Sequence, residues 1–292
     1  WINFSDNLGD YTSILIAVVF ASMAYSMEVG GNMGKGARNM WGYSTMMFTG
    51  QWGLFIVLGL FLFAPLFDTP NWFGMMLPVG FTGGFGTAAA VGGALEGVGA
   101  DAASSLGFTS ATVGTLAAII GGVIAGNWGI RKGKVSHVPK ELPEELRRGF
   151  IKNIDDRPSL GRATTNPSSI EPLALHFGFI ILTVMTAYGI NQGLSSIWEN
   201  VSVPLFAMSM VVGLIFRALM NFVGAEDYLD KDSISSISGA ATDYLIAFGV
   251  AAIVPAAIAS YWQALLLLFI LGTIFCVFFL LWFPAEFFGE RW

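Results

Sequence analysis

Long apolar runs, separated by short polar segments, dominate this sequence of 292 residues. A membrane-spanning helix needs about 20 predominantly apolar residues. Seven runs approach or exceed that length, namely residues 11–29, 40–67, 109–130, 173–197, 201–222, 235–260 and 262–283. The hydropathy pattern therefore predicts an all-α polytopic membrane protein with seven spans.

A further apolar stretch, residues 77–97, differs from the others because glycines interrupt it. Residues 82–87 read Thr-Gly-Gly-Phe-Gly-Thr. Glycine destabilises a helix interior, and irregular backbone at membrane depth is tolerated only where it is buried in protein or lines a cavity. We interpret residues 82–87 as the tip of a re-entrant hairpin over residues 74–97. The alternative is a glycine-rich packing face on an ordinary spanning helix.

The distribution of basic residues supports the hairpin. The segment 131–172 holds nine of the 14 Lys and Arg residues, and short loops rich in these residues stay in the cytoplasm. If the hairpin enters and leaves on the outer side, Lys35 and Arg38 also fall in the cytoplasm. If residues 77–97 crossed completely, these two charges would lie outside. The positive-inside rule therefore favours the hairpin.

Composition narrows the function classes. The chain is 54% hydrophobic and only 12% charged, whereas soluble domains carry about 25% charged residues. A single cysteine, Cys276, excludes an internal disulfide and a cysteine metal cluster. The sequence contains no zinc-binding His-Glu-x-x-His motif, no phosphate-binding P-loop and no nucleophile paired with a base. We therefore expect a protein that is not an enzyme and that has no nucleic-acid partner.

A weak internal repeat points to a transporter. Asp10-Tyr11 and Asp243-Tyr244 each lead into an apolar run, and the predicted topology gives the two runs opposite orientations. Inverted repeats are typical of secondary transporters. We expect a first repeat in residues 1–130, a cytoplasmic loop in 131–172 and a second repeat in 173–292. Each repeat lacks elements that the other has, so we expect the sequence to be a fragment of a longer chain.

Two motifs carry a resemblance to a known family. GFTGGFGTAAA at residues 80–90 and GFTSATVGTLAAIIGGVIAG at 107–126 resemble the hairpin tip and the following helix of bacterial sodium/glutamate symporters. The resemblance implies two inverted five-helix repeats, a re-entrant hairpin in each, a homodimer, coupling to Na⁺ and an elevator-like motion. One departure is clear, because Phe85 stands where the family usually has histidine.

The predicted function is sodium-coupled symport of glutamate or a related small carboxylate across the bacterial plasma (inner) membrane. The expected partners are the small anionic substrate, Na⁺, membrane lipid and a second copy of the chain, with no cofactor other than the coupling ion. A proton-coupled carrier, or a channel-like permease for another organic anion, is the alternative.

The hairpin tip supplies the predicted substrate site. Exposed peptide N–H groups of its glycines and the hydroxyls of its two threonines would replace the water around an acidic substrate. The predicted substrate-binding residues are Thr82, Gly83, Gly84, Phe85, Gly86 and Thr87.

The predicted sodium ligands are oxygen-bearing side chains near membrane depth. They are Asp243, Asn127 and Ser238. An acidic residue within the membrane indicates a functional role. The alternative for Asp243 is that it caps its helix. The alternative for Asn127 is that it packs against a neighbouring helix. Two other polar residues are expected near the membrane interface, where Arg217 extends its charge to the surface and His176 opens a helix.

Overall fold

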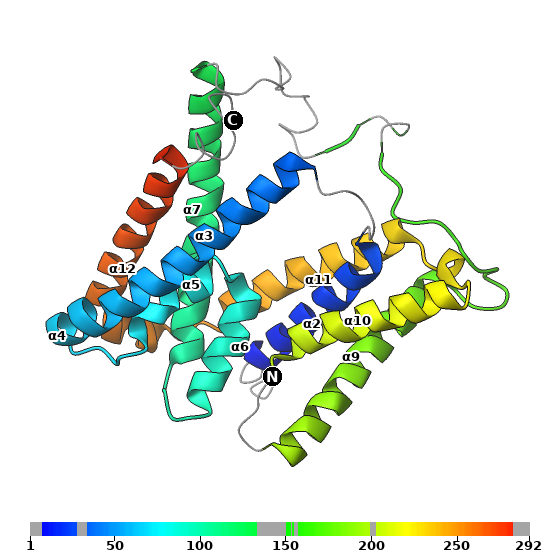
Figure 1. Cartoon of the computed structure of the whole chain (residues 1–292), viewed down its shortest axis with the longest axis horizontal. Coiled ribbons are helices and arrows are strands. Elements are labelled where there is room, and N and C mark those ends of the chain that lie inside the picture. Colours follow the sequence, from blue (N-terminus) through cyan, green and yellow to red (C-terminus); the bar gives the residue numbers. More distant parts are fainter. Residues whose placement is uncertain are drawn as a thin grey trace. The chain divides into compact units, whose positions relative to one another are not determined.

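The computed structural model describes residues 8–27, 34–132, 150–152, 154, 157–198 and 203–282. All regular structure in these ranges is helical (Figure 1). Seven of the described helices are long and apolar enough to cross a membrane, which confirms the polytopic all-α fold. Part of the predicted basic loop, residues 133–149, lies outside the described residues.

The helices follow the apolar runs closely in the first part of the chain. The long ones are α2 (Leu8–Ser26), α3 (Lys35–Leu58), α7 (Ala103–Arg131), α9 (Pro172–Ile197), α10 (Leu205–Phe222), α11 (Lys231–Ala251) and α12 (Pro255–Trp282). A π-helical turn, η1 (Gly59–Phe63), and the short α4 (Ala64–Phe67) extend α3. The remaining elements are η2 (Phe73–Met75), α5 (Met76–Phe81), α6 (Gly84–Glu96) and η3 (Glu226–Tyr228).

One predicted boundary is wrong. The apolar pattern places the sixth span over residues 235–260, but α11 ends at Ala251 and α12 begins at Pro255. Proline favours the first position of a helix because it has no N–H to leave unpaired there. The predicted boundary instead coincides with a kink in α12 at Tyr261, whose φ and ψ are −120° and 17°.

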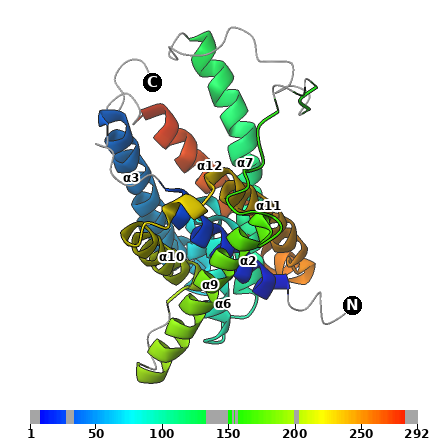
Figure 2. The same ribbon diagram turned by 90° about the vertical axis from the view of Figure 1, so that its right-hand side faces the viewer.

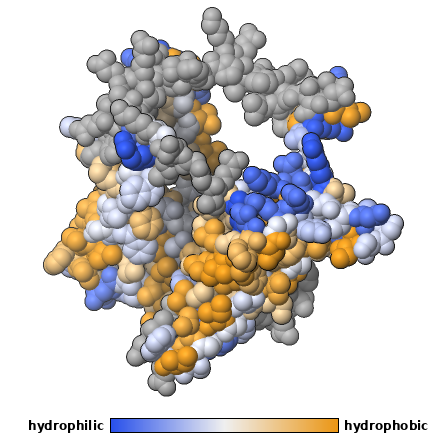
Figure 3. Space-filling model, turned by 45° about the vertical axis from the view of Figure 1, so that its right-hand side comes forward, coloured by the Kyte–Doolittle hydropathy of each residue, from blue (hydrophilic) through white to orange (hydrophobic). Residues whose placement is uncertain are grey.

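The chain forms two compact units, each assembled from separate segments. The first unit contains residues 1–31, 83–112 and 160–260, and the second contains residues 32–82, 113–159 and 261–292. Large apolar side chains are exposed on helices of both units, including Ile120 on α7 and Met185 on α9 (Figure 3). Such exposure fits helices that face lipid.

In the first unit, α2 packs along α10 and α11 and also contacts α6 and α9 (Figures 1 and 2). Three alanines of α2 are fully buried, at positions 17, 21 and 24. A side chain placed at Gly213 of α10 would lie 2.7 Å from the Cβ of Ala24. Small residues at both positions therefore let the two backbones approach closely. A hydrogen bond of 2.7 Å between the buried hydroxyls of Tyr25 and Thr183 joins α2 to α9.

In the second unit, aromatic rings and paired glycines hold α3 against its neighbours. Phe55, Phe63 and Phe73 are fully buried. A Cβ at Gly59 would lie 3.0 Å from the Cα of Gly74, so the π-helical turn and η2 meet backbone to backbone. This contact explains the two glycines, because a side chain at either position would separate the two elements.

A polar network joins the starts of α9 and α11 in the first unit, and it corrects the prediction for His176. His176 is completely buried rather than interfacial. The backbone N–H of Asp230 donates to Nε2 of His176 at 2.8 Å. Nδ1 of His176 therefore carries the ring proton, and it donates to the carbonyl of Pro172 at 2.6 Å. The histidine thereby ties the first turn of α9 to the residue before α11.

Arg217 also differs from its prediction. Its guanidinium donates to the carbonyls of Ala24 and Met27 at the end of α2 and lies 3.6 Å from a carboxylate oxygen of Glu226. Only 11% of its side chain is exposed. A cation at the carbonyl end of a helix stabilises the unpaired carbonyls and the helix dipole, so Arg217 caps α2 instead of extending to the membrane surface.

Asp230 is the N-cap of α11, and its carboxylate is the centre of this network. Its Oδ2 accepts hydrogen bonds from the N–H and the hydroxyl of Ser233, at 2.9 and 2.7 Å, and from the N–H of Arg162 at 2.9 Å. Burial by itself would raise the pKa of Asp230, but the bonds from Ser233 and Arg162 outweigh it and lower the pKa below its usual value of 3.8. The ionised carboxylate therefore stabilises the fold.

We predict that Asp230→Asn lowers the stability of the protein at neutral pH by about 0.3–1 kcal/mol. Asparagine still caps α11, but it has no negative charge to interact with the helix dipole. The pKa of Asp230 is lowered in the folded protein. The ionised carboxylate therefore contributes its full stabilisation when the pH is above the pKa of an unfolded chain, about 3.9. This stabilisation is lost as the pH falls through the pKa of the folded protein. Melting temperatures of both proteins between pH 7 and pH 3 should converge below about pH 4. A constant difference over this range would contradict the assignment.

Candidate functional site

The glycine-rich stretch forms two short helices with a break between them. α5 ends at Phe81, and α6 begins at Gly84, whose φ is +70°. Residues with a side chain avoid this left-handed conformation, at a cost of about 1–2 kcal/mol, so glycine at this position permits the break. α5 has 6 residues and α6 has 13, so neither is long enough to span a membrane. The break lies at the predicted hairpin tip, and the re-entrant path through the membrane stays a prediction.

Two close contacts hold the first turn of α6 within the first unit. A Cβ at Gly86 would lie 2.2 Å from Cγ1 of Ile16 on α2. A Cβ at Gly249 of α11 would lie 2.3 Å from Cδ1 of Phe85, and Phe85 is only 5% exposed. The Phe85 ring thus packs against α11. Its side chain fixes the position of α6 and gives no polar contact to a solute.

The two threonines beside the break donate their hydroxyl protons to backbone carbonyls. Thr82 Oγ1 donates to the carbonyl of Pro78 at 2.8 Å, and Thr87 Oγ1 donates to that of Gly83 at 3.0 Å. Each oxygen keeps lone pairs, so these hydroxyls suit a cation or an ammonium group better than a carboxylate. Thr82 and Thr87 are predicted substrate ligands, and an amino-acid substrate carries such an ammonium group.

The backbone N–H groups in the first turn of α6 are the hydrogen-bond donors that the break offers to a ligand. The first N–H groups of a helix have no partner within the helix, and no side chain caps α6 at Gly83. At this end Gly84 is half-buried, whereas Phe85 and Gly86 are buried. An anion at a helix N-terminus gains both hydrogen bonds and the favourable end of the helix dipole.

The predicted sodium ligands are spread over two helices. Asp243 lies exposed in the middle of α11, so it is not the cap of that helix, a role that Asp230 fills. Ser238 is half-buried on α11, and its carbonyl accepts the hydroxyl of Thr242 at 2.8 Å. Five residues along a helix turn the side chain by about 140°, so Ser238 and Asp243 point in different directions. Asn127 is exposed on the part of α7 that belongs to the second unit.

A cavity of about 600 Å³ in the first unit contains two carboxylates that the sequence analysis did not assign to a site. Asp10 lies in the first turn of α2, and Glu96 ends α6 and accepts the N–H of Ser104 at 3.0 Å. Among the described residues, no basic side chain lines the cavity. Its carboxylates therefore create a negative potential, which raises the local concentration of cations.

The comparison with known families is decisive. The family model described as sodium/glutamate symporter matches residues 13–290. The chain belongs to the sodium/glutamate symporter family. No curated protein and no solved structure matches it. The symporter family is a family of transporters, and with seven apolar helices this member is a multi-pass membrane protein.

The family resemblance carried by the two sequence motifs is thereby confirmed. The residues that sequence reasoning missed in this symporter are those whose roles depend on distant neighbours, such as Glu96 and the Tyr25–Thr183 pair. Polar side chains inside apolar runs were the available signal. That signal marks a residue as unusual, but it does not identify the partner that the residue contacts.

We predict that Gly249→Ala destabilises the symporter, because the new methyl group overlaps the Phe85 ring. Overpacking of this kind costs about 1–3 kcal/mol, and it should lower both the melting temperature and the rate of uptake. Gly239→Ala is the matched control, since Gly239 lies on the same helix with nothing within 4 Å of its would-be Cβ. The control should be neutral or slightly stabilising. Equal behaviour of the two variants would contradict the packing of Phe85 on α11.

Proposed function

We propose that this protein couples the entry of glutamate, or of a related small carboxylate, to the inward movement of Na⁺ across the bacterial plasma membrane. The observation that carries the proposal is the interrupted helix at residues 82–87, in a member of the sodium/glutamate symporter family. Interrupted helices in transporters offer their N-terminal ends to anionic groups and their free carbonyls to cations.

In this proposal the N–H groups of Gly84, Phe85 and Gly86 bind the substrate carboxylate. The α6 dipole favours negative charge at this end of the helix. The oxygens of Thr82 and Thr87 then accept from the ammonium group of an amino acid, or bind Na⁺, because their protons already serve backbone carbonyls. Phe85 contributes through its packing on Gly249, so the side chain that replaces the family histidine positions the donors without binding the solute.

For the coupling ion, we propose Asp243 as the charged ligand, with Ser238 and Asn127 as the other candidates. Na⁺ prefers oxygen ligands, and an ionisable side chain in a spanning helix is costly unless it has a function. The exposed position of Asp243 on α11 leaves its carboxylate accessible. The same carboxylate would also serve a proton-coupled carrier, so the coupling ion needs a direct test.

The oligomeric state and the transport motion complete the proposal. We propose a homodimer whose hairpin-bearing part moves in an elevator-like manner, as the family resemblance implies. The division of the chain into two compact units, each formed from separate segments, supports such a motion, since each unit has its own packed interior.

The decisive experiment is uptake of radiolabelled L-glutamate into proteoliposomes that contain the purified protein. We predict uptake above equilibrium when an inward Na⁺ gradient is imposed, and none above background when K⁺ replaces Na⁺ or when only a pH gradient is imposed. Uptake that follows the pH gradient without Na⁺ would establish the proton-coupled alternative. Passive conductance without accumulation would establish the channel-like alternative.

We further predict that Asp243→Asn raises the Na⁺ concentration for half-maximal uptake at least about tenfold, which corresponds to about 1.4 kcal/mol of lost binding. Asp232→Asn is the matched control, because Asp232 is an exposed carboxylate in the first turn of the same helix. Melting temperatures should be similar for both variants. An unchanged Na⁺ dependence in Asp243→Asn would remove Asp243 from the set of sodium ligands.

A further inference from the structure

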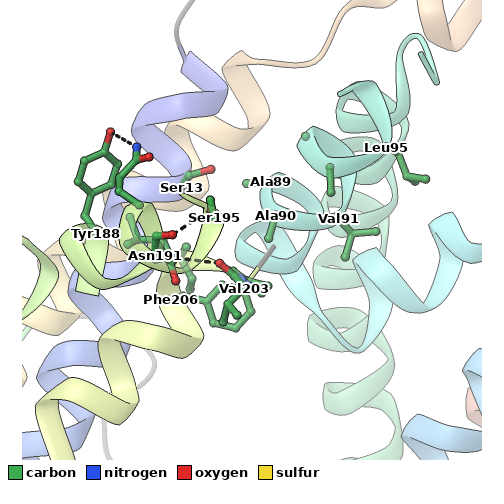
Figure 4. Close-up of a pocket in the computed structure, with 16 residues that line it drawn as sticks. Ser13, Ala89, Ala90, Val91, Leu95, Tyr188, Asn191, Ser195, Val203 and Phe206 are labelled. Carbon is green, nitrogen blue, oxygen red and sulfur yellow. Dashed lines mark hydrogen bonds between the residues drawn. The ribbon is translucent and has the colours of Figure 1, made fainter. Parts of the chain in front are cut away.

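A second cavity in the first unit, of about 690 Å³, lies among α2, α6, α9 and the start of α10 (Figure 4). On one side it is polar, with Ser13 of α2 and Asn191 and Ser195 of α9, and on the other side it is lined by small apolar residues such as Ala90 of α6. None of the described residues that line it carries a formal charge at neutral pH. None of the proposed glutamate or sodium ligands lines it either.

Asn191 leaves one hydrogen-bonding group unused in this cavity. Its Nδ2 donates to the carbonyl of Val203 at 2.9 Å, whereas its Oδ1 is buried and has no protein partner. A buried polar atom without a hydrogen bond costs roughly 1–3 kcal/mol. The bond to Val203 fixes which end of the amide carries the nitrogen, so the unused atom is an acceptor. It can therefore accept a hydrogen bond from a bound molecule.

The neighbouring polar groups are arranged so that they also favour an uncharged ligand. Gln192 Nε2 donates to the hydroxyl oxygen of Tyr188 at 2.7 Å, and this bond leaves the Tyr188 proton free to be donated. A charged group that enters this cavity would lose part of its hydration, which is costly, and the described lining residues offer it no counter-charge. A hydroxyl group can both donate to Asn191 and accept from Tyr188.

An exposed apolar stripe of α9 leads to the polar cavity. Ile181, Met185, Tyr188 and Gln192 follow one another at spacings of four, three and four residues, which places them on one face of the helix. Ile181 and Met185 are exposed, and Tyr188 and Gln192 line the cavity. Trp198, at the end of α9, is also exposed, as is usual for tryptophan near the membrane–water interface. The face is therefore apolar along the helix and polar at its end.

We propose that this cavity binds a membrane lipid whose uncharged polar end is a glycerol group. The glycerol hydroxyls pair with Asn191 Oδ1 and the Tyr188 hydroxyl, and the acyl chain lies along Ile181 and Met185. None of the proposed transport ligands lines this cavity, and binding to it does not depend on the proposed function.

The test uses the purified, delipidated full-length protein in detergent, with 1-monooleoylglycerol as the probe. Native mass spectrometry should show one molecule bound per chain, and the melting temperature should rise with probe concentration. Methyl oleate, which has the same chain without hydroxyls, and free glycerol, which has the hydroxyls without a chain, should bind at least tenfold more weakly. Equal binding of methyl oleate, or equal binding of free glycerol, would overturn the proposal.

Variants locate the site. Asn191→Leu should weaken monooleoylglycerol binding at least tenfold, whereas Asn221→Leu, at an exposed asparagine at the end of α10, should bind as the wild type does. Tyr188→Phe changes only one hydroxyl at an exposed position, so it keeps the test valid if Asn191→Leu does not fold. It should weaken binding at least threefold. Wild-type affinity in Tyr188→Phe, or in a folded Asn191→Leu, would overturn the proposal.

Discussion

The structure depends on a backbone constraint between Gly83 and Gly84. The positive φ of Gly84 prevents α5 and α6 from forming one helix, and a side chain at this position would strain the turn. An interruption exposes N–H groups that ordinary helical bonding would satisfy. In a membrane such groups need a protein partner, water or a ligand. The break is thus costly unless it has a use, and the use that we propose for it is binding an anionic solute.

A break of this kind requires firm support, and small residues provide it. Hydrocarbon chains are as apolar as leucine side chains, so membrane helices associate through close packing and hydrogen bonds rather than through the hydrophobic effect. In the first unit, Gly86 meets Ile16, Gly249 meets Phe85, and Gly213 meets Ala24, each at a distance that excludes a further methyl group. These contacts fix the first turn of α6 and the position of α2. Polar bonds from Arg217 and Asp230 then secure the helix ends.

The sequence predicts the architecture well because hydropathy and length determine whether a segment spans a membrane. Seven spans and the position of the break were predicted from the pattern of apolar residues and glycines. The boundary between the last two spans was wrong, because the apolar run continues through residues 252–254 and hydropathy is insensitive to a short interruption. Pro255 was the signal that marked the correct boundary.

The site was less predictable, because its details depend on contacts between distant segments. The motif around residues 82–87 identified the place, but not that Phe85 packs on Gly249 or that both threonine hydroxyls donate to backbone carbonyls. Their residue types place His176 and Arg217 at the membrane interface, yet both form hydrogen bonds with groups more than 50 residues away in the sequence. A single sequence does not contain these pairings.

The most direct test of this account asks whether the chain enters and leaves the membrane on the same side around the break. Cys276 is the only cysteine, so a Cys276→Ser protein can carry single cysteines at Asn71 and Val98, which are both exposed and flank α5 and α6. A membrane-impermeant thiol reagent, applied to intact cells and to inverted vesicles, reports the side of each residue. The account predicts that both cysteines react only from the outer side. Reaction of one from each side would mean that residues 77–97 cross the membrane, and it would contradict the account.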